Sequence, residues 1–423
     1  MLRVKVIDAC RKIDSNGMYQ RYMANEHVST DEIIAYQEQK KKDLLKFHLE
    51  NNPGYVEFLK RNGISDFENL KWEQLPIITK ADLKGEEMIV KSNAHHLHHT
   101  GGSTGKPLIY ALSRDCVSAL WAAIWRAFSV LDVKPCEALV MVAGTSLFNK
   151  ESLSRKVYNW LNRFHVVSAF DLNDETLKKT YEMMVRKNIK VVYGYTSSVL
   201  CLLKYFDANN IKLKLKGVFT TSEMMIPAVR ELARKCCDCD VIDIYGANDG
   251  GILAFECKEH SGYHVSWERS FVEIIDNRII LTDLFNTSFP FIRYQVEDMT
   301  SADSLIMEPC KCGRTMFRLP DVSGRIFDMI KDDDGNMISS AFFTGESTAN
   351  DKSFTQIQVV EKGGVLCVNF VSEQHDEKYY TQKYYEIFKQ RINRELKIVV
   401  NDPIHIKKNG KSPIYVNLDK EKV

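Results

Sequence analysis

The spacing of apolar and polar positions changes along this chain, and each spacing predicts a different kind of element. Residues 1–90 have a pattern that is typical of helices, and Ser29 with Glu32 forms a capping box at the start of one of them. Thr79 is placed to cap a further short helix that begins near Ala81. This first region is therefore predicted to be mostly helical.

From about residue 92 to residue 250, short apolar runs that are typical of strands alternate with amphipathic segments that are typical of helices. Strands are predicted at 139–142, 191–193, 217–220 and 241–245, and helices at 176–187, 199–206 and 227–236. A strand that is followed repeatedly by a helix indicates an α/β sheet. In such a sheet the ligand site lies at the strand ends.

Beyond residue 262 the pattern changes to short β-rich pieces, including 278–282 and 291–294. An Asp-Gly turn within 329–338 predicts a hairpin. The tail then reads as strand, strand, helix and strand, at 356–360, 365–371, 377–396 and 398–400. The predicted fold class is α/β, with a large N-terminal domain containing α/β sheets and a small α+β C-terminal domain.

Composition narrows the classes of partner that we expect. The 423 residues include 44% hydrophobic and 27% charged positions, and the formal net charge is +1. These values are typical of a globular chain and give no electrostatic reason to expect nucleic acid or a membrane as partner. The first residues mix charges with apolar side chains, so we expect no signal peptide. Eleven cysteines, two of them adjacent, do not resemble a secreted disulfide framework, so we expect a cytoplasmic protein.

The most informative local motif lies between His98 and Pro107. It consists of Thr100, Gly101, Gly102, Ser103, Thr104, Gly105 and Lys106. Glycines let backbone N–H groups crowd an anion, the hydroxyls add donors and the lysine adds positive charge, so this segment can bind a polyphosphate. It is not a standard P-loop, because only three residues separate Gly101 from Gly105 and a proline follows the lysine. Taken alone, the segment also fits a plain turn.

Three further segments follow this motif along the chain, at 245–249, 291–298 and 409–411. The segments 75–80, 256–257, 310–314 and 324–325 add to the same series. Their order and spacing resemble the adenylate-forming superfamily and, within it, the phenylacetate–CoA ligase and CapK-like branch. The resemblance covers nearly the whole chain.

The resemblance implies an enzyme that activates a small-molecule carboxylic acid with ATP. The carboxylate would attack the α-phosphate, so that acyl-AMP forms and pyrophosphate leaves. Residues 100–106 would close over the β- and γ-phosphates, and Lys411 would be the catalytic lysine that bridges carboxylate and α-phosphate. From the residues alone, Lys411 also fits a solvated basic loop with Lys407 and Lys408.

The resemblance also assigns residues to the adenine of ATP or AMP. Tyr245, followed by Gly246, would stack against the base, and Ser222 with Glu223 would line the same pocket. From the residues alone, Tyr245 fits a buried aromatic at a strand end equally well.

Three charged residues complete this implied nucleotide site. Asp298 would accept hydrogen bonds from both ribose hydroxyls, and Arg325 would reach the ribose or a phosphate. Asp249 stands where the family usually places a magnesium-binding glutamate, so the Mg²⁺ geometry must adapt to a side chain shorter by one methylene. A surface salt bridge is the alternative role for Arg325.

The same resemblance implies a nucleotide- and acid-binding domain at 1–324, a hinge at 325–330 and a mobile C-terminal domain at 331–423. The acyl group would pass to CoA, although Phe327 and the acidic turn 332–334 depart from the thioester-forming pattern. An amine or a hydroxyl on a sugar is the alternative acceptor. A non-catalytic nucleotide-binding protein is the alternative to an enzyme, and a homodimer is common among similar proteins.

A separate group of residues has the chemistry of a structural zinc site. Three thiols and an imidazole form a tetrahedral Zn²⁺ set, and Cys-x-Cys-Gly is a metal-knuckle type of turn. The set is Cys257, His264, Cys310 and Cys312, and it would brace a β subdomain at about 255–320. Similar cysteines in the branch support it. Cys236, Cys237 and Cys239 compete as ligands, and buried free thiols are the alternative.

Four histidines at 95, 96, 98 and 99 look like a further metal cluster. Side chains on an extended segment alternate between its faces, so at most two of the four are expected to converge. His98 could instead line the pocket for the acid.

Overall fold

The structure is a computed structural model. It describes residues 2–83, 85–99, 108–143, 153–169, 172–225, 227–322, 324–325, 329–334, 337–340, 343, 348, 351, 353–406 and 413–419. The predicted phosphate-binding segment and Lys411 lie outside the described residues.

The N-terminal region is helical, as predicted. It contains α1 (Leu2–Arg11), α2 (Ser15–Ala24), α3 (Thr30–Asn51), α4 (Pro53–Arg61) and the short 3₁₀ helices η1 (Trp72–Gln74) and η2 (Glu86–Met88). The predicted capping box begins α3, where the Ser29 backbone N–H donates to the Glu32 carboxylate at 2.9 Å. The helix predicted near Ala81 is wrong. Residues 80–83 form a turn instead, in which the Asp82 N–H donates to the Thr79 carbonyl at 3.1 Å.

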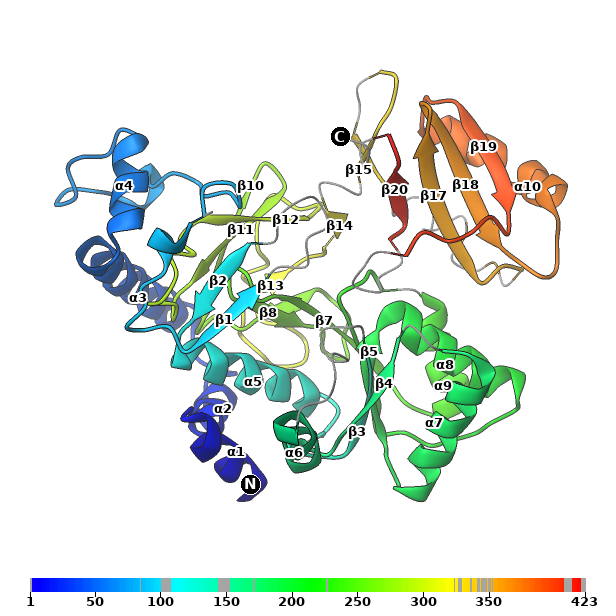
Figure 1. Cartoon of the computed structure of the whole chain (residues 1–423), viewed down its shortest axis with the longest axis horizontal. Coiled ribbons are helices and arrows are strands. Elements are labelled where there is room, and N and C mark those ends of the chain that lie inside the picture. Colours follow the sequence, from blue (N-terminus) through cyan, green and yellow to red (C-terminus); the bar gives the residue numbers. More distant parts are fainter. Residues whose placement is uncertain are drawn as a thin grey trace.

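An eight-stranded sheet lies at the centre of the chain, with the order β13-β9-β8-β7-β6-β5-β3-β4 (Figure 1). Strands β4, β3, β5, β6 and β7 run parallel to one another. Strands β8, β9 and β13 extend the sheet from β7, and each runs antiparallel to its neighbour. Their bounds are β3 (Leu139–Ala143), β4 (Phe164–Ser168), β5 (Val191–Tyr195), β6 (Gly217–Thr221), β7 (Val241–Ala247), β8 (Ile252–Phe255), β9 (Tyr263–Val265) and β13 (Arg318–Leu319).

Helices cover both faces of this sheet. They are α5 (Arg114–Ser129), α6 (Leu153–Asn162), α7 (Asp174–Arg186), α8 (Thr196–Ala208) and α9 (Pro227–Cys237). Val218 on β6 belongs to the core that α7, α8 and α9 cover. The next residue, Phe219, faces the other way and packs against Phe128 of α5, with ring centroids 4.5 Å apart. This alternation is that of a sheet buried on both faces, and it confirms the predicted α/β class.

A second sheet is antiparallel and consists of β10 (Ser270–Ile275), β11 (Arg278–Asp283), β12 (Tyr294–Met299) and β14 (Gly324–Arg325). A hairpin of β1 (His96–His99) and β2 (Ile109–Leu112) packs into the same core. The sequence predicted a strand at 291–294, but β12 begins only at Tyr294. Arg293 adopts a positive φ of 50°, which interrupts the extended backbone before that residue.

The C-terminal residues form a third sheet of order β19-β18-β17-β20 with its own buried core (Figure 1). Its elements are β17 (Gln356–Lys362), β18 (Val365–Val371), α10 (Glu377–Arg391), β19 (Leu396–Val400) and β20 (Tyr415–Asn417). The predicted hairpin before it is present as β15 (Met329–Lys331) and β16 (Met337–Ser339). Helix α10 ends earlier than predicted, because Ile392 is extended and Leu396 already begins a strand.

The histidine on α3 at position 48 is fully buried between α3, α4 and the residues after β11. The Nε2–H of His48 donates to the Asn286 carbonyl at 2.9 Å, and its Nδ1 accepts from the Asn52 amide at 3.3 Å. Asn52 also donates to the Met88 carbonyl at 3.0 Å. These partners fit the neutral imidazole, and burial lowers the pKa of His48 to about 4.

His48 should therefore make the free energy of unfolding decrease as the pH falls. The unfolded chain binds a proton at His48 near pH 6.5 and the folded chain only near pH 4. The neutral His48 therefore contributes about 3 kcal/mol to the free energy of unfolding. This contribution is fully present above pH 6.5 and is lost as the pH falls toward 4. The free energy of unfolding from urea titrations, measured across this range for the native chain and for His48→Gln, should show a shallower acid decline in the variant. Parallel curves would contradict the assignment.

Candidate nucleotide and metal sites

Two side chains that were predicted to bind adenosine meet where two sheets adjoin. Tyr245 lies in β7 of the eight-stranded sheet, and Asp298 lies in β12 of the second sheet. The Tyr245 hydroxyl donates to Oδ2 of Asp298 at 2.8 Å. Positions on β12 alternate between buried and half-buried, which directs Tyr294 and Asp298 to one face. Gly246, after the tyrosine, is exposed. An aromatic ring and a carboxylate therefore lie side by side at this junction.

A tight turn after β7 positions Asp249. Gly250 and Gly251 have φ values of 98° and 80°, a region that residues with a Cβ rarely adopt. A Cβ at Gly251 would also lie 2.4 Å from Cγ of Asp283. Asp283 cannot easily move away, because the buried Arg269 guanidinium donates to its two carboxylate oxygens at 2.9 and 2.6 Å. The two glycines thus let the chain turn directly over a buried ion pair and hold Asp249 at the end of the strand.

Two tyrosines approach this turn from the second sheet and from the hairpin. The Tyr294 hydroxyl donates to Oδ2 of Asp249 at 3.4 Å, and the Asn248 side chain hydrogen-bonds to Tyr110 on β2. Burial, followed by the nearby Asp249 charge, raises the pKa of both Tyr110 and Tyr294 well above the usual range. Both phenols therefore stay protonated, and Tyr294 can act as a donor that orients the Asp249 carboxylate.

The Ser222-Glu223 segment follows β6 and meets the start of α8. The Ser197 backbone N–H donates to Oε2 of Glu223 at 2.7 Å, and the Thr196 hydroxyl donates to the Glu223 carbonyl. A carboxylate is favoured at a helix N-terminus, where backbone N–H groups have no partner inside the helix. Ser222 has a positive φ of 68°, so the chain turns sharply here. The segment lies at the carboxyl end of the parallel strands, where the βα pattern predicts a ligand site.

Described residues on β1 and β2 flank the predicted phosphate-binding segment and lead toward this junction. His99 of β1 pairs with Ile109 of β2, so these flanking residues lie on neighbouring strands. Tyr110 follows directly and approaches the Asp249 turn. In the second sheet, Asp298 and Arg325 are cross-strand partners in the β12–β14 register. The fold thus brings Asp249, Asp298 and Arg325, which were predicted from separate segments, to the junction between the two sheets.

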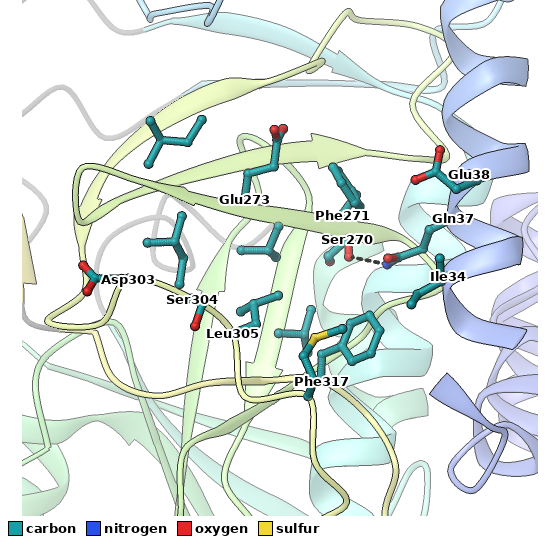
Figure 2. A pocket seen from close by; sticks show the side chains of 15 residues that line it. Ile34, Gln37, Glu38, Ser270, Phe271, Glu273, Asp303, Ser304, Leu305 and Phe317 are labelled. Carbon is teal, nitrogen blue, oxygen red and sulfur yellow. Dashed lines mark hydrogen bonds between the residues drawn. The ribbon is translucent and has the colours of Figure 1, made fainter. Parts of the chain in front are cut away.

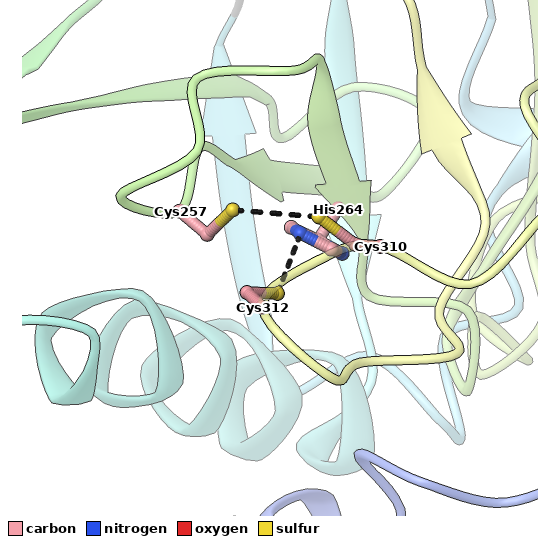
Figure 3. Close-up of side chains that lie close together, drawn as sticks. All are labelled: Cys257, His264, Cys310 and Cys312. Atoms are coloured by element: carbon pink, nitrogen blue, oxygen red, sulfur yellow. Dashed lines mark hydrogen bonds between the residues drawn. The ribbon is translucent and has the colours of Figure 1, made fainter.

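The predicted zinc ligands lie together in the structure (Figure 3). Cys257 follows β8, His264 is on β9, and Cys310 and Cys312 lie in the loop before β13. The Cys257 and Cys310 sulfurs are 3.7 Å apart, and the Cys312 sulfur is 3.6 Å from Nε2 of His264. The Cys310 N–H donates to the Arg314 carbonyl, and the Gly313 N–H donates to the Cys310 carbonyl, both at 2.9 Å, which builds the expected knuckle.

These two separations are close to those of a tetrahedral zinc site, and the four ligand atoms together lie within 4.8 Å of one another. With Zn–S bonds of about 2.3 Å and a Zn–N bond of about 2.0 Å, tetrahedral angles require about 3.8 Å between two sulfurs and about 3.5 Å between sulfur and nitrogen. Burial lowers the pKa of His264 to about 3, so its ring is neutral and can act as a ligand. Cys236, Cys237 and Cys239 do not belong to this group, which is the one metal-competent cluster found among the described residues.

A cavity of about 450 Å³ lies apart from both groups, along the edge strand β10 between α3 and the loop 303–307 (Figure 2). The Gln37 amide donates to the Ser270 carbonyl in its wall at 3.3 Å. None of the predicted site residues that the structure describes lines it. Of the four clustered histidines, His96 and His98 face each other with ring centroids 4.6 Å apart, as the alternation of a strand predicts.

Comparison with solved structures identifies the fold. A crystal structure of 2-hydroxyisobutyryl-CoA ligase in its postadenylation state aligns with a TM-score of 0.73 and 17% identity, over 93% of this chain and 91% of that chain. An open conformation of that ligase with CoA gives 0.59, over 93% of both chains. The anthranilate CoA ligase AuaEII gives 0.52 at 14% identity, over 75% of this chain and 65% of that chain. The fold is thus the two-domain fold of adenylate-forming ligases.

Three named relatives are similar in sequence to this chain. Protein CapK of Staphylococcus aureus is 22% identical over 325 residues, which cover 73% of this chain and 72% of CapK. The phenylacetate-coenzyme A ligase of Thermus thermophilus is 22% identical over 348 residues, covering 74% of each chain, and that of Escherichia coli is 24% identical over 334 residues, covering 72% and 74%. No protein-family profile matches. Over about three quarters of its length the chain is similar to CapK and to phenylacetate-coenzyme A ligases, the branch that its segments resemble.

Sequence reasoning missed the residues that support Asp249. Tyr294 lay inside a segment that carried the resemblance, so its position was noted but its contact with Asp249 was not. No local pattern marks Tyr110, Arg269 or Asp283, because each acts through a partner that is distant in the sequence. The pair Gly250-Gly251 was the available signal, since two successive glycines after a strand indicate an unusual turn.

Proposed function

We propose that this protein activates a carboxylic acid with ATP as acyl-AMP, releases pyrophosphate and passes the acyl group to CoA. The observation that carries the proposal is the hydrogen bond of 2.8 Å between the Tyr245 hydroxyl and the Asp298 carboxylate. It places the predicted adenine-stacking ring beside the predicted ribose-binding acid, although 53 positions separate them in the chain. The relatives named phenylacetate-coenzyme A ligase support the same chemistry over about three quarters of the chain.

Nucleotide binding would use the junction between the two sheets. The Tyr245 ring would stack on adenine beside Ser222 and Glu223, while the exposed Gly246 leaves space next to the base. Asp298 would accept the ribose hydroxyls, and Arg325, opposite it on β14, would reach the ribose or a phosphate. The Tyr245 hydroxyl fixes one side of the carboxylate and leaves lone pairs for the sugar.

The reacting phosphates would lie between the segment 100–106 and Asp249. Backbone N–H groups and Lys106 of that segment would neutralise the β- and γ-phosphates. The Asp249 carboxylate fits a Mg²⁺ ion, which would neutralise phosphate charge, and Tyr294 would orient that carboxylate. Lys411 would bring an ammonium to the attacking carboxylate and the α-phosphate, where negative charge grows in the transition state.

Pyrophosphate exchange tests this proposal directly. Purified full-length protein with Mg²⁺, ATP, labelled pyrophosphate and a panel of aromatic, fatty and amino acids should move label into ATP with at least one acid. The exchange needs no acyl acceptor, so it reports acyl-AMP formation alone. No exchange with any acid, in protein that still binds ATP, would favour the non-catalytic alternative.

The acceptor is tested in a second assay on the acid that supports exchange. With CoA added, we expect a thioester product by mass spectrometry and AMP formation in equal amount. The alternative acceptor, which the resemblance to the CapK-like branch implies, is an amine or a hydroxyl on a sugar. AMP release that needs an amino sugar and ignores CoA would establish that alternative. We place these reactions in the cytoplasm, and a homodimer stays a prediction.

We also propose that Cys257, His264, Cys310 and Cys312 hold a structural Zn²⁺ ion. Their donor types and their proximity, within 4.8 Å of one another, support a closed tetrahedral site, which would leave no open position for chemistry. The ion would link β8 and β9 to the loop that leads into β13. Its role would be to brace this edge of the sheet.

Metal analysis of untagged protein should find about one zinc per chain. Cys312→Ser should lose the metal and lower the thermal midpoint by several degrees, because a structural zinc contributes directly to folding. Cys10→Ser, which removes an exposed free thiol, and Cys239→Ser are matched controls that should keep both. Equal zinc loss in Cys239→Ser and Cys312→Ser, or zinc-free native protein, would contradict the site.

A further inference from the structure

Helices α1 and α6 carry a concentration of exposed apolar side chains that the proposed activity does not use. Trp160 and Leu153 on α6 are 67% and 78% exposed. Among the described residues, five of the twelve most exposed large apolar side chains lie on these two short helices: Leu2, Val6, Leu153, Val157 and Trp160. Single exposed apolar residues are ordinary, but a contiguous group indicates a contact surface.

The two helices lie together (Figure 1), so the five exposed residues lie on neighbouring elements. On α6 the apolar positions 153, 157 and 160 follow the i, i+4, i+7 spacing of a single helix face. On α1, positions 2 and 6 are one turn apart. We call this the α1–α6 surface.

The two helices that carry the α1–α6 surface are rich in positive charge. The two helices contain five cations, namely Arg3, Lys5, Arg11, Arg155 and Lys156. Their single carboxylate, Asp8, is buried and accepts hydrogen bonds from the Ser15 hydroxyl and the Asn16 N–H. The whole chain is nearly neutral at +1, so this positive charge is a local concentration.

Trp160 is held in its exposed position. The Arg3 guanidinium lies 5.2 Å from the centre of the Trp160 ring, and its Nη1 donates to the Trp160 carbonyl at 3.0 Å and to the Leu161 carbonyl at 3.4 Å. These carbonyls lie at the C-terminal end of α6, where a cation is favoured. Arg3 thus fixes α1 to α6 and presents the indole toward solvent at little cost in conformational entropy.

The charge and the shape of this surface distinguish between possible occupants. A second copy of the chain would place the same cations against one another across a two-fold axis. An acidic helical partner would need a groove, and the one cavity described above lies elsewhere, on β10. An anionic bilayer needs no groove. It accepts convex helices with Trp and Leu on one face and Lys or Arg around them.

We propose that the α1–α6 surface binds an anionic lipid bilayer. Trp160, Leu153 and Leu2 would enter the interface between headgroups and acyl chains, and Lys5 and Lys156 would contact lipid phosphates. The contact is peripheral, since no described helix has the length and apolar composition that a membrane span requires. No membrane partner was expected from the sequence, because the net charge of the whole chain is close to zero. A net charge does not show how the charged residues are distributed over the surface.

Vesicle flotation of the full-length protein tests the proposal. The protein should float with phosphatidylglycerol–phosphatidylcholine vesicles, remain behind with pure phosphatidylcholine vesicles, and dissociate as NaCl rises. The double variant Lys5→Glu with Lys156→Glu should partition about 30-fold more weakly, and Trp160→Ser should weaken binding by about tenfold. Lys60→Glu with Lys178→Glu makes the same charge change on the exposed faces of α4 and α7 and should bind like the native protein.

Three outcomes would overturn the proposal. The first is equal partition into both kinds of vesicle. The second is equal loss of binding in the Lys5→Glu, Lys156→Glu variant and in its charge-matched control, Lys60→Glu with Lys178→Glu. The third is a dimer in light scattering that Trp160→Ser converts to monomer, which would assign the surface to a second copy. These readouts do not use ATP, so they are independent of the proposed reaction.

Discussion

Replacing Lys411 by alanine is expected to lower the rate of pyrophosphate exchange by about 10²–10³-fold, the largest effect on activity that we expect from a single residue. The ammonium would stabilise charge on the carboxylate and the α-phosphate in the transition state, so its removal should lower kcat more than it raises the KM for ATP. Exchange kinetics at saturating acid, with ATP varied, measure both quantities. An unchanged kcat would remove Lys411 from the mechanism.

The same stretch of sequence provides the matched control. Lys407 and Lys408 are close in sequence, and the paired replacement Lys407→Ala with Lys408→Ala removes more positive charge than Lys411→Ala. If the loop acts only as a basic surface, the double variant should lose more exchange activity than Lys411→Ala. If Lys411 acts at the reacting atoms, the double variant should keep nearly all of its activity.

The sequence predicted the central sheet well because local signals agreed with the tertiary structure there. The apolar runs at 139–142, 191–193 and 217–220 lie within β3, β5 and β6, since strands buried on both faces must be apolar throughout. Boundaries failed where the backbone turned for reasons outside the local pattern. Arg293 delays β12 through its positive φ, and the Arg293 guanidinium donates to the carbonyls of Glu73 and Leu75.

The candidate site could be predicted where the residue types and their spacing along the chain already indicate the chemistry. The cluster of Cys257, His264, Cys310 and Cys312 is such a case, because a Cys-x-Cys-Gly knuckle and two further donors define a geometry with few alternatives. Tyr245 and Asp298 came from the resemblance, and neither spacing nor composition would have paired them. Their contact depends on how two sheets adjoin, which a periodic pattern does not encode.

The supporting residues were the least predictable part. Asp249 is held by Tyr294, by two glycines with positive φ and, beneath them, by the Arg269–Asp283 ion pair. Each of these contributors is ordinary in its own local sequence. Only the folded arrangement shows that the hairpin, the central sheet and the second sheet meet at this turn.

The largest expected effect on stability comes from the buried ion pair of Arg126 and Glu268. Arg126 on α5 is fully buried, and its guanidinium donates to both oxygens of Glu268 at 2.8 and 2.9 Å. It also donates to the Tyr22 carbonyl at 3.1 Å and lies 4.4 Å from the Tyr22 ring. The pair therefore connects α2, α5 and the segment that leads into β10.

Glu268→Ala should lower the free energy of unfolding by about 3–5 kcal/mol, because it leaves a buried guanidinium without a counterion. The double replacement Arg126→Met with Glu268→Leu removes both charges and should recover most of this loss. Urea unfolding followed by tryptophan fluorescence measures both, since Trp125 and Trp267 adjoin the pair in sequence. A double variant as unstable as Glu268→Ala would show that the pair itself, and not an uncompensated charge, maintains the packing of α5 on α2.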